Sequence, residues 1–327
     1  MSYRLTTGAE PQGGVLDMSM LAPGSWRESP FPRPGRHFGA IFFGDEDSGP
    51  FAALNAIEPM EEPYSPSPGH GHRSDSWRIS IKGALRVGAQ SYQPGSFRFQ
   101  EAGLLYGADD NGWSPDGAQS VVMMADRRGA TAIAAEAKNA PLFTDAAAAF
   151  DRWAGRPERK DFPIVAGVAT TLGTPRFGRI DGSFEKAGDW REPSPGLRME
   201  VGLCGDRASG PVVLLIAAEA GREAMPELRL PTEIMHVVIG GGAASGDRGL
   251  APADVRLVEA DAAGPAFTAG APHLWLASVI GDRRALARAQ CASDRWISDV
   301  RAAVAKLEAA WSRGGTHAAV PEKETNP

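Results

Sequence analysis

Hydrophobic and polar residues alternate along short runs of this chain, and glycine or proline separates the runs. In "WRISI" (77–81), the aromatic and aliphatic residues fall on one side of an extended strand, with Arg78 and Ser80 on the other. In "SFRFQ" (96–100), both phenylalanines lie opposite Arg98. Runs of period two between turn residues predict an antiparallel sheet with one buried face. We therefore expect an all-β fold with few helices.

Two segments carry a helical pattern instead. The first is "TDAAAAFDRWAG" (144–155), which opens on Thr144 as a predicted N-cap. The second is long and amphipathic and covers residues 282–311. Residues 1–35 are rich in proline and glycine and predict an extended arm over the sheet, and residues 313–327 are expected to be disordered.

An internal repeat organises the chain. Three segments recur in the same order at nearly constant offsets of 161, 158 and 156 residues: 42–60 as 203–221, 93–102 as 251–260, and 121–130 as 277–286. Even the predicted helices share a short match, because "DRW" occurs at 151–153 and again at 294–296. Collinear matches of this kind predict a duplicated β-domain.

The repeat divides the chain into predicted units. After the arm, residues 36–158 form a first barrel with its following helix. Residues 159–312 form a second barrel with the long C-terminal helix, and the boundary lies near 155–165, in "GRPERKDFP".

Composition narrows the class of protein. The chain has 327 residues with 43% hydrophobic and 23% charged residues, which is typical of a globular protein. Its net charge of −6 disfavours a nucleic-acid partner, because phosphate binding requires a basic surface. Cys204 and Cys291 are expected to be small buried hydrophobes. The N-terminus lacks a signal-peptide pattern and the apolar runs are short, so we expect a cytoplasmic protein without a membrane partner.

The stretch "SPGHGHRSDSWRISIKG" (67–83) carries the first chemical motif. His70 and His72 stand two apart, three residues separate the second histidine from Ser76, and six more precede Gly83. Alternating histidines at the entrance of a strand can direct two imidazoles at one metal ion.

A second motif follows on the next strands. Gly95 is followed by five residues, then Glu-Ala-Gly (101–103), two residues, Tyr106, three residues and Asp110. Both spacings resemble, without a gap, the two motifs of the cupin superfamily. The resemblance covers about residues 40–130. Together with the repeat it identifies the whole chain as similar to a bicupin, with two tandem double-stranded β-helix (jelly-roll) barrels.

The resemblance implies a metal site with departures from the family pattern. In cupins three histidines and one glutamate hold the metal. Here His70 and His72 remain as the implied metal ligands, while Ser76 takes the glutamate position and Tyr106 the last histidine position. A serine hydroxyl is a poor ligand for a divalent cation, and tyrosine ligates iron only as the phenolate.

Two imidazoles alone hold Zn²⁺ or Fe²⁺ weakly, because catalytic sites use at least three protein ligands. A further ligand could come from Asp75, Glu61, Glu62 or His37.

The second repeat departs further from the metal-binding pattern. Aligned through Gly240, its four ligand positions read Glu227, Arg229, Glu233 and Gly264, so only the acid is kept. His236 and His273 fall outside these positions, and we interpret them as structural or surface residues. The second barrel is therefore expected to shape the protein or the substrate pocket without binding a metal.

The aromatic strands leave one alternative open. Trp77, Phe97 and Phe99 are expected in the core or in a pocket wall, so Arg78 and Arg98 face either the barrel lumen or solvent. An arginine in the lumen would favour a carboxylate or phosphate substrate.

The motif Asp-Arg-Arg occurs at 126–128 and at 282–284. Because it stands in both repeats, we expect a structural Arg–carboxylate pair at the end of a strand.

Two functional hypotheses follow. The first is a metal-dependent enzyme for a small organic molecule, with one divalent metal (iron, or else manganese, nickel or zinc) on His70 and His72. The resemblance implies a dioxygenase-like oxidoreductase, or an isomerase or lyase. The second is a metal-free binding or structural bicupin, or a metal-independent isomerase or epimerase in which Tyr106 and His70 or His72 are the catalytic acid and base. The resemblance also implies a homodimer.

Overall fold

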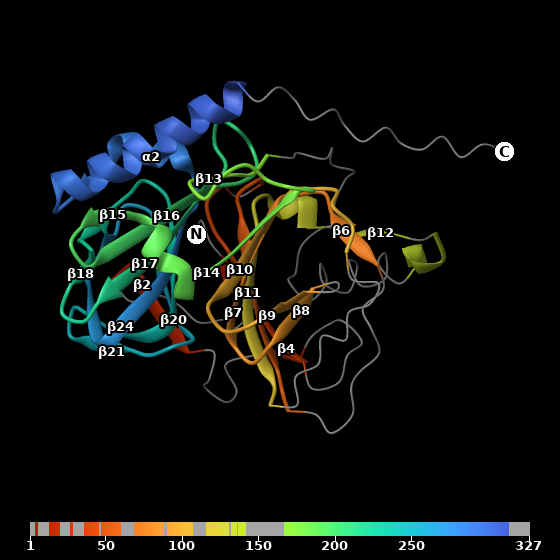
Figure 1. The fold of residues 1–327 in the computed structure, drawn as a ribbon, viewed down its shortest axis with the longest axis horizontal. Coiled ribbons are helices and arrows are strands. Elements are labelled where there is room, and N and C mark those ends of the chain that lie inside the picture. The colour runs from red at the N-terminus through yellow and green to blue at the C-terminus, as the bar shows by residue number, and fades with distance from the viewer. Residues whose placement is uncertain are drawn as a thin grey trace.

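Two β-barrels lie side by side, and one long helix lies across the second of them (Figure 1). The structure is a computed structural model, and it describes residues 4–5, 13–19, 27–28, 36–45, 47–59, 69–87, 90–106, 116–130, 132–135, 137–141 and 167–313. The long strands pair in antiparallel fashion in both barrels. The prediction of an all-β chain with antiparallel sheets is confirmed.

The main sheet of the first barrel has the strand order β1-β4-β5-β11-β7-β10-β14, with β3 paired to β4. Its strands are β1 (Arg4–Leu5), β3 (Arg27–Glu28), β4 (Arg36–Phe42), β5 (Phe51–Ile57), β7 (Ser76–Lys82), β10 (Ser96–Gln100), β11 (Ala118–Met124) and β14 (Arg179–Ser183). Two short ribbons complete this half: β6 (His70–His72) with β12 (Ala132–Ala134), and β8 (Leu85–Val87) with β9 (Gln90–Tyr92).

The main sheet of the second barrel has the order β13-β16-β17-β24-β20-β22-β2, with β15, β18 and β21 at its sides. Its strands are β2 (Val15–Ser19), β13 (Ala169–Thr170), β15 (Arg191–Ser194), β16 (Leu197–Leu203), β17 (Val212–Glu219), β18 (Glu223–Met225), β20 (Ile234–Ser245), β21 (Arg248–Leu250), β22 (Asp254–Val258) and β24 (Phe267–Ile280). A small sheet joins β19 (Leu228–Arg229), β23 (Ala263–Gly264) and β25 (Gln290–Cys291). Short 3-10 helices are η1 (Arg127–Ala130), η2 (Ala137–Asn139), η3 (Phe184–Asp189) and η4 (Arg283–Arg288).

Each half of the chain contributes one strand to the sheet of the other half. Strand β14 pairs with β10 of the first barrel, and β2 from the predicted arm pairs with β22 of the second (Figure 1). On each exchanged strand an aspartate lies directly opposite an arginine: Asp181 opposite Arg98, and Asp17 opposite Arg256. The sequences "VLDMS" and "RIDGS" of these strands share their aspartate and serine at an offset of 164 residues, a short correspondence that the patterns above do not include.

The aromatic face of the first sheet packs against the second barrel. Trp77, Phe97 and Phe99 are fully buried in one core that also contains Val213 and Val279 of the second barrel. The prediction that these aromatic residues are core residues is confirmed. Because side chains alternate across a strand, their neighbours in sequence must point to the opposite face, into the lumen of the first barrel.

The C-terminal helix α2 (Asp294–Arg313) is shorter than the pattern predicts. Residues 283–288 form η4, and β25 is drawn into a sheet with β19, so the predicted helical start at residue 282 is wrong. The helix begins where the Ser293 hydroxyl accepts a hydrogen bond from the Trp296 amide. Its apolar stripe packs on the second barrel, with Val300 and Leu307 buried in the core of that barrel.

The repeated Asp-Arg-Arg trios have the structural role that was expected. In both repeats the second arginine pairs with the aspartate of its own trio at 2.6 Å. The first arginine instead donates to backbone carbonyls of the repeated Gly-Asp hairpin. These acceptors are the carbonyls of Phe43 and Gly49 for Arg127, and of Cys204 and Gly210 for Arg283. Each trio therefore ties a strand end to the hairpin of the same repeat.

Several expectations concern residues whose structure is not described. The predicted helix 144–155, the boundary at 155–165 and the tail beyond residue 313 all lie outside the described residues. Within the described residues, Cys204 is buried, Cys291 is half-buried, and both are free thiols. No helix in this part of the chain combines the length and hydrophobicity that crossing a bilayer requires.

Candidate functional site

The histidine motif lies on β6, a short strand held on both edges. One edge pairs with β12, where Ala132 lies opposite His72 and Ala134 opposite His70. On the other edge, His70 and Tyr106 exchange two backbone hydrogen bonds of 2.8 Å each. This pairing brings together His70 and Tyr106, the first and last ligand positions of the cupin motifs, as the spacing of the motifs predicts.

The three side chains of this motif form one cluster. The rings of His70 and Tyr106 lie 4.5 Å apart, and the two imidazole rings lie 5.5 Å apart at 90°. His72 Nε2 lies 3.1 Å from the Tyr106 hydroxyl oxygen, within hydrogen-bonding distance. The site residues predicted from the sequence, His70, His72 and Tyr106, therefore meet at one point.

Arg78 of β7 completes the cluster from the lumen side. Its guanidinium donates to the Tyr106 hydroxyl oxygen and lies 4.1 Å from the centre of the Tyr106 ring. Only 5% of Arg78 is exposed. Of the two alternatives for this arginine, the structure selects the lumen and excludes the solvent face.

Arg98 of β10 lies in the same lumen but has a carboxylate partner. Its Nε donates to Asp181 on the exchanged strand at 3.1 Å, and its terminal nitrogen donates to Gln90 at 3.0 Å. The Tyr92 hydroxyl donates to the same aspartate at 2.7 Å. Burial and this hydrogen bond raise the pKa of Tyr92 well above its ordinary value. Arg98 is thus a neutralised member of a fixed network.

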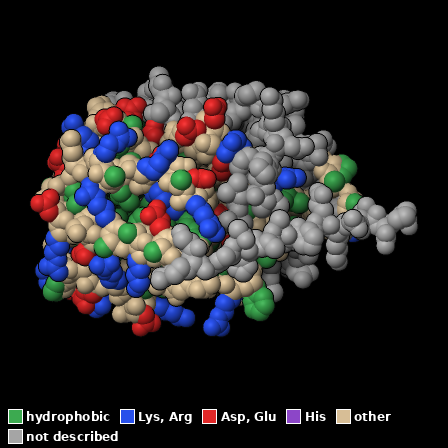
Figure 2. All heavy atoms as spheres, turned by 90° about the horizontal axis from the view of Figure 1, so that it is seen from above, with side chains coloured by type: hydrophobic (Ala, Val, Ile, Leu, Met, Phe, Trp, Pro, Cys, Tyr) green, Lys and Arg blue, Asp and Glu red, His purple; other side chains and the backbone are tan. Residues whose placement is uncertain are grey.

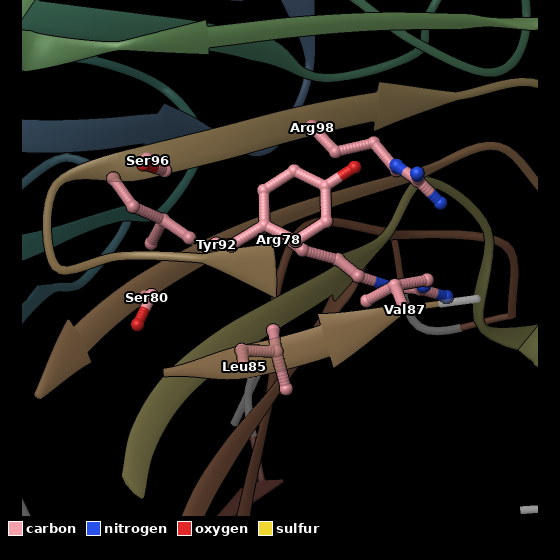
Figure 3. Close-up of a pocket in the computed structure, with 8 residues that line it drawn as sticks. Arg78, Ser80, Leu85, Val87, Tyr92, Ser96 and Arg98 are labelled. Carbon is pink, nitrogen blue, oxygen red and sulfur yellow. The ribbon is translucent and has the colours of Figure 1, made fainter. Parts of the chain in front are cut away.

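A narrow cavity lies between the two arginines and the β8–β9 ribbon. Figure 3 shows both guanidinium groups extending in the same direction, with the Tyr92 ring between them and Leu85 and Val87 on the facing ribbon. Its lining residues are Arg78, Ile79, Ser80, Leu85, Val87, Tyr92, Ser96 and Arg98. The cavity is small, positively charged on one side and apolar on the other.

The candidate third ligands for a metal do not join this cluster within the described residues. Asp75 is fully buried on the opposite face of β7, where it accepts hydrogen bonds from the Ala102, Gly167 and Gly205 amides at 2.7–2.9 Å. Burial raises the pKa of Asp75 to about 7. Its Oδ2 serves the two contacts with the second half of the chain and its Oδ1 the contact with Ala102, which excludes Asp75 as a ligand here.

The other candidates cannot be placed. Glu61 and Glu62 lie outside the described residues, and only the backbone of His37 is described, on β4. Across the described residues there is no group of three His, Cys, Asp or Glu side chains that could hold a metal ion.

The side chains available as ligands in the cluster of His70, His72 and Tyr106 determine how well it fits a metal ion. The described residues supply two imidazoles, and the phenol oxygen of Tyr106 is already bonded to the cationic Arg78. A divalent cation at that oxygen would meet the guanidinium charge, which opposes its binding. The described residues therefore do not by themselves fit a divalent metal centre.

The second barrel carries apolar side chains where the first carries its motif. Gly264 pairs with Leu228 as Tyr106 pairs with His70, so Leu228 occupies the first ligand position. Two residues on, Leu230 corresponds to the second histidine. Both leucines are 1% exposed in the core of the second barrel.

This strand register corrects the alignment by one residue. Glu233 corresponds to Asp75 rather than to Ser76, because His236 and Arg256 pair as Arg78 and Arg98 do. The Glu233 carboxylate accepts a hydrogen bond from the Gly44 amide of the first half at 2.9 Å. The retained acid is therefore a contact between halves and not a remnant of a metal site.

His236 is a structural residue in the lumen of the second barrel, as expected. Its Nδ1 lies 2.9 Å from the Ser278 hydroxyl, and burial together with nearby Arg256 lowers the pKa of His236 to about 3. The imidazole is therefore neutral. His273 lies half-buried against Trp275, with ring centres 4.9 Å apart.

Sequence reasoning missed part of the site. Asp181 had a usable signal, since "VLDMS" and "RIDGS" repeat, but five residues are too few to stand out without the structure. Gln90 and Tyr92 carry no motif, and only the folding of the β8–β9 ribbon over the lumen brings them to Arg98.

Comparison with known proteins gives a likeness in fold. No protein-family model and no curated protein matches the chain. A solved structure described as a "putative dioxygenase" from Nostoc punctiforme is similar over 89% of this chain and 92% of its own, with a TM-score of 0.52 at 14% identity.

Two further solved structures are more distant. Oxalate decarboxylase from Bacillus subtilis gives a TM-score of 0.43 at 15% identity over 85% of this chain and 78% of its own. Salicylate 1,2-dioxygenase from Pseudaminobacter salicylatoxidans gives 0.41 at 13% identity over 71% of each chain. Only the first similarity has a TM-score above 0.5 and supports an argument, and at 14% identity that argument concerns the fold alone.

Proposed function

We propose that this chain, which has the bicupin fold, is an enzyme acting on a small organic molecule at the mouth of its first barrel. In this proposal Tyr106 is the general acid or base. The observation that carries it is the position of the Tyr106 hydroxyl, between His72 Nε2 at 3.1 Å and the guanidinium of Arg78. A hydroxyl in that position can pass its proton to the imidazole while the guanidinium stabilises the phenolate.

The reaction class follows from these groups. A base beside a fixed cation can remove a proton from a carbon next to a carbonyl group and stabilise the enolate that forms. Returning the proton to the same or to another position gives an epimerase or isomerase. His72 is the proton acceptor in this mechanism, and His70, whose ring packs on Tyr106, positions the phenol.

A metal-dependent oxidoreductase of the dioxygenase kind is the second candidate. It is favoured by the two imidazoles on neighbouring lumen positions of β6 and by the shared fold with a "putative dioxygenase". His70 and His72 would hold the ion, with iron, manganese, nickel or zinc as the metal. It requires a further ligand from residues that are not described, such as Glu61 or Glu62, and displacement of Arg78 if Tyr106 is to ligate.

Proton exchange tests the first candidate without knowledge of the natural substrate. Wild-type protein in D₂O should catalyse exchange of the C3 protons of 2-oxobutyrate or phenylpyruvate, followed by NMR. Tyr106→Phe should slow the exchange about a hundredfold or more, because it removes the group that moves the proton. His72→Gln should do the same, while His273→Gln, in the second barrel, should not. Exchange at the wild-type rate in Tyr106→Phe would refute the assignment.

Metal content separates the two candidates. Protein purified without a histidine tag is analysed by mass spectrometry, alongside His70→Ala/His72→Ala. The acid–base candidate predicts well below one equivalent of metal in the wild type, with no change in the double variant. Nearly one equivalent in the wild type that disappears in the double variant would favour the metal-dependent oxidoreductase instead. If wild-type protein neither holds metal nor exchanges protons, a binding or structural role replaces both.

A further inference from the structure

Arg78 is a buried cation without a carboxylate. Within the described residues, no Asp or Glu lies within salt-bridge distance of its guanidinium, whose partner is the Tyr106 hydroxyl. A buried charge is strongly disfavoured unless an opposite charge or several hydrogen bonds compensate it. The fold therefore maintains at this position a positive charge that its own described groups leave unbalanced.

The neighbouring arginine shows how the same lumen balances a charge. Arg78 and Arg98 are direct partners across β7 and β10, a placement in which like charges repel each other. Arg98 is neutralised by Asp181 at 3.1 Å, and this carboxylate is also paired with Arg179 at 3.2 Å. With Arg98 so paired, Arg78 carries the lumen's excess positive charge.

The second barrel shows that the fold does not need this charge. Arg256 there is balanced by Asp17, as Arg98 is by Asp181, but the position of Arg78 is taken by His236. That imidazole is held by Ser278 and packs against Phe267, with ring centres 4.8 Å apart. The second barrel has apolar side chains in place of the histidine motif, and it also lacks the cation that corresponds to Arg78.

We propose that Arg78 binds a carboxylate group of the substrate, which is a monocarboxylic acid with an apolar body. This inference rests on the proposed function and names its substrate class. A single unbalanced positive charge matches a monoanion, and the planar guanidinium presents paired N–H donors that fit a carboxylate. Leu85 and Val87 line the same cavity and present an apolar wall to the body of the acid.

The position of Arg78 also places a bound carboxylate next to Tyr106, the proposed acid–base group. The same guanidinium that would bind the carboxylate contacts the Tyr106 hydroxyl. A carboxylate held there would bring the carbon next to it toward the acid–base group. A phosphate dianion fits less well, because the second guanidinium in the lumen is already occupied by Asp181.

Direct binding measurements test the inference with defined probes. Calorimetry on the full chain compares propionate and benzoate with propionamide and benzamide, which have the same shape without the charge, and with inorganic phosphate. At least one acid should bind at least tenfold more tightly than its amide. Arg78→Gln should weaken that binding at least tenfold, while Arg198→Gln, on the half-exposed surface of β16, should not.

Each other outcome overturns the inference. Equal binding of acid and amide, preferential binding of phosphate, no binding of any probe, or full binding by Arg78→Gln would each contradict it. The result is also distinct from that of the proposed function. Carboxylate binding that depends on Arg78 without proton exchange would refute only the catalytic role of Tyr106, and exchange without Arg78-dependent binding would refute only this inference.

Thermal unfolding tests whether Arg78 has a purely structural role. Arg78→Gln removes a charge and leaves no described carboxylate without a partner, so its melting temperature should equal or exceed that of the wild type. Arg98→Gln leaves Asp181 without its buried partner and should melt at a lower temperature. If Arg78→Gln melts below Arg98→Gln, Arg78 supports the fold and the inference fails.

Discussion

Asp17→Ala is expected to lower the free energy of unfolding by about 3–5 kcal/mol, because it leaves the Arg256 guanidinium buried and unpaired. The Asp17 oxygens accept bonds from Nε and a terminal nitrogen of Arg256 at 2.6 and 3.0 Å. The two side chains are only 7% and 3% exposed, so solvent screens the pair little. This pair anchors β2, the strand by which the N-terminal region joins the second barrel. Urea unfolding followed by circular dichroism measures the effect.

Asp181→Ala is the matched control, because it removes the equivalent carboxylate in the first barrel. The Asp181 side chain is 33% exposed, and Gln90 would keep one hydrogen bond to Arg98. The expected loss is therefore smaller, about 1–2 kcal/mol. In Asp17→Ala/Arg256→Met, where no charge is left behind, most of the loss should be recovered. Equal losses for Asp17→Ala and Asp181→Ala, or no recovery in the double variant, would contradict this account.

Asp75→Ala is the second change with a large expected effect, about 3–5 kcal/mol at pH 5. It removes the acceptor of three backbone amides, those of Ala102, Gly167 and Gly205, and leaves the last two donors buried and unsatisfied. Two of the three donors belong to the second half of the chain, so the contact between halves weakens as well. Chemical denaturation measures the loss.

Asp254→Ala provides the comparison for this effect. The Asp254 carboxylate also accepts a backbone amide, that of Ala251 at 2.8 Å, but in an exposed turn where water can replace it. Its loss should be below about 1 kcal/mol. If Asp75→Ala loses no more than Asp254→Ala, Asp75 is not the structural contact that its bonds indicate.

The ionisation of Asp75 makes stability depend on pH. Its pKa in the folded protein is about 7, above the 3.8 expected when unfolded, so the folded state retains a proton between these values. The stability from this group is complete below about pH 4 and is lost as pH rises to about 7, by up to about 1.4 kcal/mol per pH unit. Glu200, whose pKa burial also raises to about 7, adds a similar dependence.

Asp75→Asn isolates the contribution of Asp75, because asparagine does not titrate while Glu200 remains in both proteins. The fall in unfolding free energy from pH 4 to pH 7 should be visibly shallower in Asp75→Asn than in the wild type. Parallel profiles would mean that Asp75 is ionised throughout this range.

The sequence alone determined which residues of the two motifs lie together. The cupin-like spacings of the two motifs predict that His70, His72 and Tyr106 lie together, and the antiparallel bridge between His70 and Tyr106 brings them together in the folded chain. The repeat determined the duplicated all-β fold in the same way, since both copies carry the same turns and strand lengths.

Only the tertiary structure decided which face of a strand is the lumen. A period of two looks the same from either side, so the sequence left Arg78 and Arg98 between lumen and solvent. The second barrel packs on Trp77, Phe97 and Phe99, and this contact turns both arginines inward.

Contacts between residues distant in sequence also explain the two other predictions that the structure corrected, the start of the C-terminal helix and the alignment of Glu233. The helical pattern from residue 282 cannot reveal that Gln290–Cys291 pairs with β19, because that strand lies some 60 residues earlier in the sequence. Nor can offsets that vary between 156 and 161 fix whether Glu233 matches Ser76 or Asp75. Local residue patterns determine strands and motifs, whereas the partners of a buried charge are set by strands distant in sequence. In this protein those strands are exchanged between the two halves, so Asp181 and Asp17 reach their arginines only in the folded chain.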